Sequence, residues 1–305
     1  MTINADTLLE RLYLKSQVTK WRILAIVCAV IAVIVVLERL NPHSAIEKEF
    51  VARITLDGII GDDRKIYDLI KDVGDNSKAK AVIVWLDTPG GSAVGGEEIY
   101  LRLRELSAKK PVVAVMRSVS ASAGYLIALG TDQIFARDGT ITGSIGVLIE
   151  TAEFTELAEK LGVKPVIIKS SPLKGSPSPF EKVTPESQKA IQNIINDFYA
   201  HFVDLVAERR NLPRDKALLL SDGRVYSGKS AVQNKLIDAI GGEDEAMKWL
   251  EEQKHIHEGL DIKDVEVDKE NGLFEQLTQS ISGFFSQKSS LSLDGLVAIW
   301  HPNLH

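Results

Sequence analysis

The hydrophobic pattern after residue 50 consists of short apolar runs that alternate with amphipathic segments. The runs rich in Val and Ile predict strands at Val51–Leu56, Ala79–Leu86, Pro111–Met116, Gln133–Ala136 and Pro165–Lys169. The segments between them predict helices at Lys65–Val73, Gly96–Ala108, Ala123–Leu129 and Ala152–Leu161. Residues 81–86 are apolar throughout, which indicates a strand covered on both faces. Strands and helices in alternation predict an α/β fold with a parallel sheet.

After Pro185 the pattern becomes helical. Ser187–Arg210 carries a long apolar stripe, and shorter helices are predicted at Arg214–Leu220, Lys229–Leu236 and Glu245–Gln253. From about Asp261 the chain is polar, apart from Leu273–Phe285, whose apolar residues share one helical face. That face could pack on its own domain, lie on a membrane or dock on another subunit. Packing on its own domain is the simplest interpretation.

An uncharged apolar run, Ile23–Leu37, stands near the N-terminus. As a helix it would span about 22 Å, and Trp21, Arg22 and Arg39 would extend it toward the roughly 30 Å of a bilayer core. A cleaved signal peptide fits less well because no small-x-small cleavage site follows, and a buried core helix would lack apolar partner segments. We therefore expect an uncleaved anchor. More cations precede the run than follow it, which predicts a cytoplasmic N-terminus.

Composition narrows the possible functions. The chain has 45% hydrophobic and 26% charged residues, which is typical of a globular protein, and its net charge of −6 argues against nucleic-acid binding through a basic surface. A single cysteine, Cys28, excludes a disulfide within the chain and a Cys-rich metal site. The six histidines lack the spacing of a zinc protease. We expect no metal and no cofactor.

One motif matches the sequence pattern of a nucleotide-binding site. Gly223–Ser230 matches the phosphate-binding pattern G-x4-G-K-S. However, Leu218–Leu220 before it resembles the end of a helix, and bulky Val225 and Tyr226 occupy a loop that should curve tightly. Nucleotide binding is therefore disfavoured.

Small residues follow two predicted strands. Strand 79–86 runs into Pro89, Gly90 and Gly91, a turn whose amides could donate to an oxyanion, although most such sequences are only turns. Strand 111–116 leads into Ser118–Ala128, where a serine hydroxyl could stand at a helix N-terminus that favours negative charge. The plain alternative is an N-cap serine.

Two further clusters follow, at residues 142–147 and at 169–177, and the second contains lysines among Pro, Gly and Ser. No histidine is close to these clusters in the sequence, and His201 lies on an ordinary amphipathic helix. A lysine amine is the other available base. Its ordinary pKa of about 10.4 leaves on the order of one amine in a thousand neutral at pH 7, and desolvation lowers that pKa. Serine–lysine pairs are a known variant of the catalytic triad.

The four clusters, together with Asp222–Gly228 and Leu236–Asp238, resemble the signal peptide peptidase A (SppA) family, peptidase family S49, in its short single-repeat form. The resemblance covers roughly residues 50–250. It implies an α/β fold of the Clp-protease/crotonase type, with repeated β-β-α units and a helical C-terminal part after one transmembrane helix. The implied domains are a cytoplasmic segment (1–22), the anchor (23–38), the peptidase domain (47–255) and a tail (256–305).

The resemblance also implies roles for individual residues. Ser122 would be the nucleophile, Lys174 its general base, and Ser144 the residue that orients the lysine amine. The amide of Ala123 and one from Gly90 or Gly91 would form the oxyanion hole.

The resemblance further implies a homo-oligomeric ring, an octamer, whose active sites take serine and lysine from neighbouring subunits. The expected function is a serine endopeptidase, anchored in a bacterial inner membrane with its catalytic domain on the extracytoplasmic side, that degrades remnant signal peptides and other short hydrophobic segments. A crotonase-type acyl-CoA enzyme and a catalytically silent membrane scaffold are the alternatives.

Overall fold

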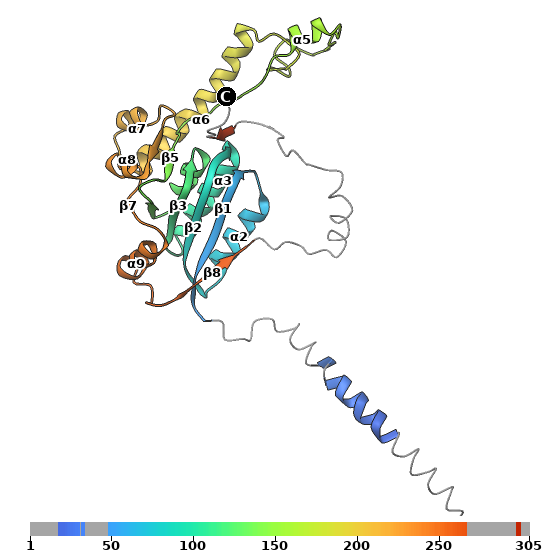
Figure 1. Cartoon of the computed structure of the whole chain (residues 1–305), viewed down its shortest axis with the longest axis vertical. Coiled ribbons are helices and arrows are strands. Elements are labelled where there is room, and N and C mark those ends of the chain that lie inside the picture. The colour runs from blue at the N-terminus through green and yellow to red at the C-terminus, as the bar shows by residue number, and fades with distance from the viewer. Residues whose placement is uncertain (1–17, 31, 34–47, 267–296, 300–305) are drawn as a thin grey trace, which may run out of the picture. The chain divides into compact units, whose positions relative to one another are not determined.

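The computed structural model describes residues 18–30, 32–33, 48–266 and 297–299 (Figure 1). The chain divides into two compact units, Met1–Lys48 and Glu49–His305. In the first unit, residues 18–30 and 32–33 are helical and exposed. Within the described ranges, no helix has both the length and the apolar character needed to cross a membrane. The predicted anchor lies partly outside these ranges, at residues 31 and 34–38.

A single sheet of nine strands organises the described part of the second unit. The strands are β1 (Phe50–Ile60), β2 (Ala79–Ser92), β3 (Val112–Ala121), β4 (Gln133–Ala136), β5 (Ile141–Gly143), β6 (Val225–Ser227), β7 (Ala239–Ile240), β8 (Asp261–Val265) and β9 (Val297–Ile299). The main order is β6-β5-β3-β2-β1-β8. The pairs of β1, β2, β3, β4, β5, β7 and β8 are parallel, whereas β6 and β9 join antiparallel. The predicted parallel α/β sheet is confirmed.

Helices cover both faces of the sheet (Figure 1). They are α2 (Arg64–Asp75), α3 (Ala93–Ser107), α4 (Ala123–Ala128), α5 (Thr155–Lys160), α6 (Pro185–Arg209), α7 (Arg214–Leu220), α8 (Gly228–Gln233) and α9 (Glu243–Lys254). Side chains of α2, α3, α4 and α6 pack with one set of strand residues, such as Ile54 and Val84, and α9 packs with the alternate set, such as Val51 and Ile83. Two-sided burial explains why these strands are apolar at almost every position.

Local sequence signals set several helix starts. The side chain of Asp63 accepts a hydrogen bond from the Lys65 amide at the start of α2. Thr184 caps α6 in the same way, and Pro185 follows at the first helical position. The helix predicted at Ser187–Arg210 therefore begins two residues earlier, at a cap that the sequence displays.

The segment 150–184, here called the arm, contradicts part of the sequence prediction. Pro165–Lys169 is not a strand: residues 163–169 have no regular secondary structure. Val166 and Ile168 are 82% and 95% exposed. An apolar β-branched run becomes a strand only beside a strand it can pair with, and the described residues offer none here. Figure 1 shows α5, the arm's helix, at the far end of α6 from the sheet.

The C-terminal part also differs from the prediction. Residues 261–265, expected to begin a polar tail, form β8, which pairs with β1 and is held to it by the ion pair between Asp264 and Arg53. Further on, β9 pairs with Gly90–Ser92 of β2. The predicted amphipathic segment 273–285 lies outside the described residues.

Candidate active site

The candidate residues lie where three neighbouring strands end. Thr88 of β2 is opposite Ser120 of β3, and Ala121 of β3 is opposite Gly143 of β5. Because parallel strands end at the same edge of a sheet, the residues that follow them gather there. Ser122, Ala123, Ser144 and the Gly90-Gly91 turn are thereby brought to one edge.

Ser122 occupies a sharp turn between β3 and α4. Its φ of 55° and ψ of −116° lie in a region that a non-glycine residue rarely adopts, and it caps α4 without a side-chain capping hydrogen bond. Its amide donates to the Gly143 carbonyl at 2.8 Å, and the residue is only 1% exposed. Backbone strain of this kind persists only where the surroundings enforce it, and it clusters at functional sites.

The first turn of α4 begins directly after Ser122. Ala123 is its first residue, and the first amides of a helix have no partner within the helix. Gly124 follows, and a Cβ there would lie 2.6 Å from Thr88 Cγ2. The small residues in this stretch thus allow α4 to pack closely against β2.

The predicted Pro-Gly-Gly turn lies within β2 in the structure, where Gly90 is opposite Ile59 and Gly91 is opposite Ile60 of β1. The name Pro-Gly-Gly turn is kept for residues 89–91. Gly90 has a φ of 116°, which glycine alone tolerates readily, and its amide donates to Thr88 Oγ1 at 3.1 Å. A Cβ on Gly91 would lie 2.0 Å from the Ile60 carbonyl oxygen, so the two backbones approach more closely than any side chain allows. Of the two glycine amides proposed for the oxyanion hole, that of Gly90 already has a partner.

Ser144 follows β5 with a φ of 49°, and its amide donates to the Arg224 carbonyl at 2.9 Å. Because Gly143 bonds to Ser122, the two serines are held next to each other through one residue.

Lys174 is placed elsewhere. It lies in the arm with an exposed side chain, and its amide donates to the Ser171 carbonyl at 3.1 Å. Among the described residues, no hydrogen bond or ion pair involves its amine. The other lysine of that cluster, Lys169, is paired with Glu181. The single chain thus assembles the serine, glycine and alanine candidates without the lysine.

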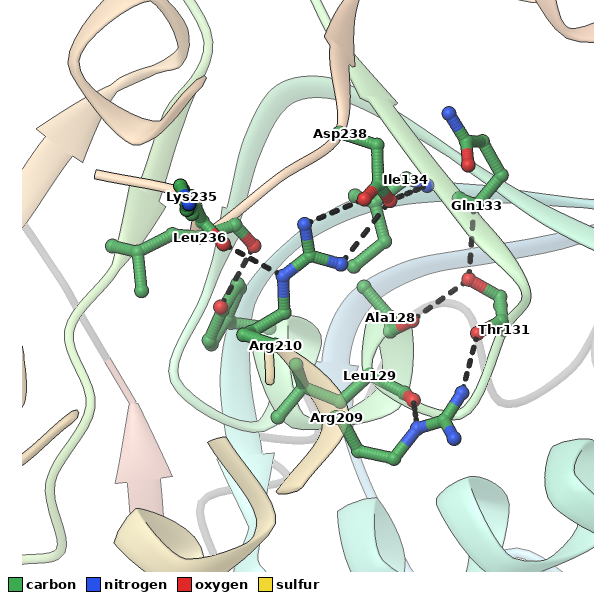
Figure 2. Close-up of polar contacts among 11 residues, drawn as sticks. Ala128, Leu129, Thr131, Gln133, Ile134, Arg209, Arg210, Lys235, Leu236 and Asp238 are labelled. Atoms are coloured by element: carbon green, nitrogen blue, oxygen red, sulfur yellow. Dashed lines mark hydrogen bonds and ion pairs between the residues drawn. The ribbon is translucent and has the colours of Figure 1, made fainter. Parts of the chain in front are cut away.

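The far end of α4 is clamped by residues from later elements (Figure 2). Arg209, at the end of α6, donates to the carbonyls of Leu129 at 2.8 Å and Thr131 at 3.1 Å. Burial lowers the pKa of Arg209 from its ordinary value. The next residue, Arg210, forms a two-pronged ion pair with Asp238 and also donates to the Lys235 carbonyl at 2.8 Å.

Tyr125 completes this clamp from within α4. Its hydroxyl donates to the Leu236 carbonyl at 2.8 Å, and burial raises its pKa, so the phenol remains a proton donor. Sequence reasoning did not identify Tyr125, Arg209 or Thr88. The two consecutive arginines at the end of a long amphipathic helix could have been noticed in the sequence. The backbone carbonyls to which they donate could not be predicted from it.

Several amides of the nucleotide-like loop are already bonded within the protein, among them that of Lys229, which donates to the Asp138 carbonyl at 3.3 Å. The amide of Gly228 donates to the Thr140 carbonyl at 2.8 Å, and that of Ser230 donates to Ser227 Oγ at 3.2 Å. Within the described part of the chain, no group of three or more His, Cys, Asp or Glu side chains could hold a metal ion.

Comparison with known proteins gives consistent matches. Residues 104–257 match the model of peptidase family S49. A Synechocystis protein named "Putative protease slr0021" is 38% identical over 229 residues, which cover 74% of this chain and 81% of that protein. The "Putative signal peptide peptidase SppA" of Enterococcus faecium is 32% identical over 227 residues, 70% of this chain and 66% of the relative. Among solved structures, the 1510-N membrane-bound stomatin-specific protease, in complex with a substrate peptide, is 20% identical, with 77% of this chain and 100% of that chain covered and a TM-score of 0.48.

Proposed function

This chain belongs to peptidase family S49 and is a serine protease, and we propose how it catalyses peptide hydrolysis. In this proposal Ser122 is the nucleophile and Lys174 is its general base. The observation that carries the proposal is the backbone of Ser122, held at positive φ between a strand and a helix start. Serine nucleophiles of other folds occupy similar strained strand-to-helix turns. Since the chain is a serine protease, the acyl-CoA enzyme and the silent scaffold are set aside.

The oxyanion of the tetrahedral intermediate would be bound by backbone amides. The Ala123 amide lies at the start of α4, where the helix supplies it with no partner. The second donor would be Gly90, whose amide bonds to Thr88, or Gly91, which lies opposite Ile60 of β1 and Ala298 of β9. Preorganised amides of this kind stabilise charge that develops only in the transition state.

To act as a base, Lys174 requires a desolvated environment, which the single chain does not provide. A lysine amine acts as a base at neutral pH only where desolvation lowers its pKa, and Lys174 is exposed. We propose that a neighbouring copy of the chain supplies this environment, so that Lys174 of one subunit serves Ser122 of the next. Ser144, beside Ser122, would then hydrogen-bond the incoming amine.

The exposed apolar side chains of the arm support the proposal that another subunit covers it. Its exposed apolar side chains are Phe154, Leu157, Leu161, Val163, Val166, Ile167, Ile168, Leu173, Phe180 and Val183. A soluble surface rarely exposes so many apolar residues on one segment, and such segments are typical of protein interfaces. We propose that the arms join the subunits into a closed ring, with an octamer as the expected size and a Clp-protease/crotonase-type fold as its subunit.

The proposed substrates are remnant signal peptides and other short hydrophobic segments. Two features support them. The antiparallel pairing of β9 with Gly90–Ser92 means that an extended strand fits beside the oxyanion turn, as a peptide substrate would. The apolar run 23–37 would anchor the enzyme in the bacterial inner membrane, with the protease domain on the extracytoplasmic side.

A labelling experiment with the full chain in detergent tests the catalytic pair. Ser122→Ala should abolish reaction with a fluorophosphonate probe and lower hydrolysis of a synthetic signal peptide on the order of a thousandfold or more, and Lys174→Ala should do the same for hydrolysis. Lys164→Ala, which removes another exposed lysine of the arm, is the matched control and should keep nearly full activity. Wild-type hydrolysis by Lys174→Ala would disprove its role as the base.

Mixing the two inactive variants tests shared sites. Under subunit exchange, Ser122→Ala and Lys174→Ala chains should form rings in which some sites hold both groups, so part of the activity returns. Mixed rings without activity would mean that each site is built within one chain.

A further inference from the structure

Thr88 stands at the centre of the candidate site although nothing in the motif assigns it a task. It is completely buried, between Asp87 and the Pro-Gly-Gly turn. Its hydroxyl donates to the Gly58 carbonyl of β1 at 2.5 Å and accepts the Gly90 amide at 3.1 Å. One side chain therefore ties the oxyanion turn to the neighbouring strand.

The strand pairing is irregular next to Thr88, although it resumes at Gly90 and Gly91, which lie opposite Ile59 and Ile60 of β1. The pairing of β1 with β2 shifts register between Asp57 and Ile59, and that of β2 with β3 shifts between Leu86 and Thr88. The β1–β2 register skips Gly58, Thr88 and Pro89, so the hydrogen bond from the Thr88 hydroxyl to the Gly58 carbonyl joins the two strands at this irregularity. Gly90 follows this irregularity with a φ of 116°, and the hydrogen bond from its amide to Thr88 Oγ1 helps to fix that conformation.

The other branch of Thr88 contacts the nucleophile's helix. The space where Gly124 lacks a Cβ is 2.6 Å from Thr88 Cγ2, so the methyl group packs against the first turn of α4. Thr88 thus touches both parts of the proposed oxyanion hole: the turn through its hydroxyl, and α4 through its methyl.

We propose that Thr88 is a positioning residue, which holds the Pro-Gly-Gly turn at a set distance from Ser122 so that the amides of both parts converge on one oxyanion. This inference rests on the proposed role of Ser122. Without the hydroxyl, the turn loses its link to Gly58 and its amides become misaligned. Catalysis depends on such alignment, because a displacement of about 1 Å can cost a hundredfold in rate.

Thr140 provides a matched control. It is 2% exposed, and its hydroxyl also donates to one carbonyl, that of Arg117 at 2.7 Å, and accepts one amide, that of Arg137 at 3.0 Å. It lies outside the turn and α4. Thr140→Val and Thr88→Val therefore remove equivalent buried hydroxyls and should lower the melting temperature similarly.

The experiment compares hydrolysis of a synthetic signal peptide by the full chain in detergent. Thr88→Val should lower kcat about 10- to 100-fold with KM within about threefold, whereas Thr88→Ser and Thr140→Val should stay within about threefold of the wild-type kcat. The apparent pKa of the kcat/KM pH profile should not move in Thr88→Val, since the base is untouched. The rate of fluorophosphonate labelling should fall with kcat.

If Thr88→Val does not fold, Thr88→Ala and Thr88→Ser give the same comparison, because both lack the methyl and only the alanine lacks the hydroxyl. Equal kcat for the hydroxyl-containing and hydroxyl-free variants, or an equal loss in Thr140→Val, overturns the inference. Ser122→Ala separates this failure from that of the proposed function: an active Ser122→Ala enzyme refutes the nucleophile, whereas an inactive one with normal Thr88→Val refutes only the positioning role.

Discussion

The small residues around Ser122 are required by close contacts between backbones. Gly91 meets the carbonyl of Ile60, and Gly124 meets the methyl of Thr88. Gly96 of α3 lies opposite Ala123, with its missing Cβ only 3.0 Å from the Ala123 Cβ. Each position leaves no room for a larger side chain, so the turn, α3 and α4 can converge on the serine.

Gly91→Ala should therefore damage both stability and activity. The new Cβ would lie 2.0 Å from the Ile60 oxygen, a backbone atom that cannot rotate away. We expect the free energy of unfolding to fall by about 1–3 kcal/mol, as for other overpacked sites, and kcat to fall strongly because the proposed oxyanion donors must move. Thermal unfolding and peptide hydrolysis measure the two effects.

Gly139→Ala is the control for this substitution, because nothing lies within 4 Å of its added Cβ. It should remain close to the wild type. A Gly91→Ala protein as stable and active as the control would show that the approach to Ile60 is not required.

At the level of elements, α4 depends on its neighbours. It has six residues, fewer than an isolated helix needs to be stable. Arg209 of α6 donates to the carbonyls of Leu129 and Thr131 at the far end of α4. The Tyr125 hydroxyl donates to the Leu236 carbonyl, in the loop that Arg210 holds through Lys235 and Asp238. The long helix α6 thus helps to hold in place the short helix that begins directly after Ser122.

Arg210→Lys should weaken this clamp while keeping the charge. The Arg210 side chain is 11% exposed and its Asp238 partner 26%, and a lysine cannot reproduce the two-pronged pair or the bond to Lys235. We expect a loss of about 1–3 kcal/mol in the free energy of unfolding, measured by denaturant titration.

The pair between Arg214 and Asp204 offers a contrast within the same helical region. Its side chains are 55% and 57% exposed, so Arg214→Lys should cost less than about 0.5 kcal/mol. Similar losses in both variants would mean that the Arg210 clamp contributes no more than a surface ion pair.

At the scale of the whole molecule, the arm is the part that the single chain leaves unsatisfied. It carries Lys174 and a row of exposed apolar side chains, while Ser122 is buried at the sheet edge. Assembly through the arm would cover the apolar row and complete the site in one step.

Ile168→Glu should break that assembly. Ile168 is 95% exposed in the chain, so the substitution should leave the melting temperature of the subunit unchanged, yet a charge buried in an interface is costly. We expect smaller particles by analytical ultracentrifugation and a parallel loss of hydrolysis. Leu219→Glu, at a 77% exposed apolar position on α7, should keep both. An Ile168→Glu protein that retains wild-type size and activity would contradict an interface at the arm.

The local pattern was sufficient to predict much of the fold and to select residues for the candidate site. Strands buried on both faces must be apolar throughout, so β1 to β4 and their helices were recognisable from the sequence. The small residues at the strand ends marked the edge where Ser122 and the glycines of β2 meet. The short β8 was missed because Asp261–Val265 alternates charged and apolar residues and pairs only because β1 has a free edge. The run Pro165–Lys169 was misread for the opposite reason, since it has strand composition but no partner strand in the described chain.

The sequence alone determined which residue types could do the chemistry, because nucleophile, base and amide donors each need a particular side chain or its absence. Only the tertiary structure decided which of them meet. It joined Ser122 to Gly143, turned the Gly90 amide toward Thr88, and left Lys174 on an exposed arm. Distances between segments far apart in the chain depend on packing and register, which no local pattern encodes.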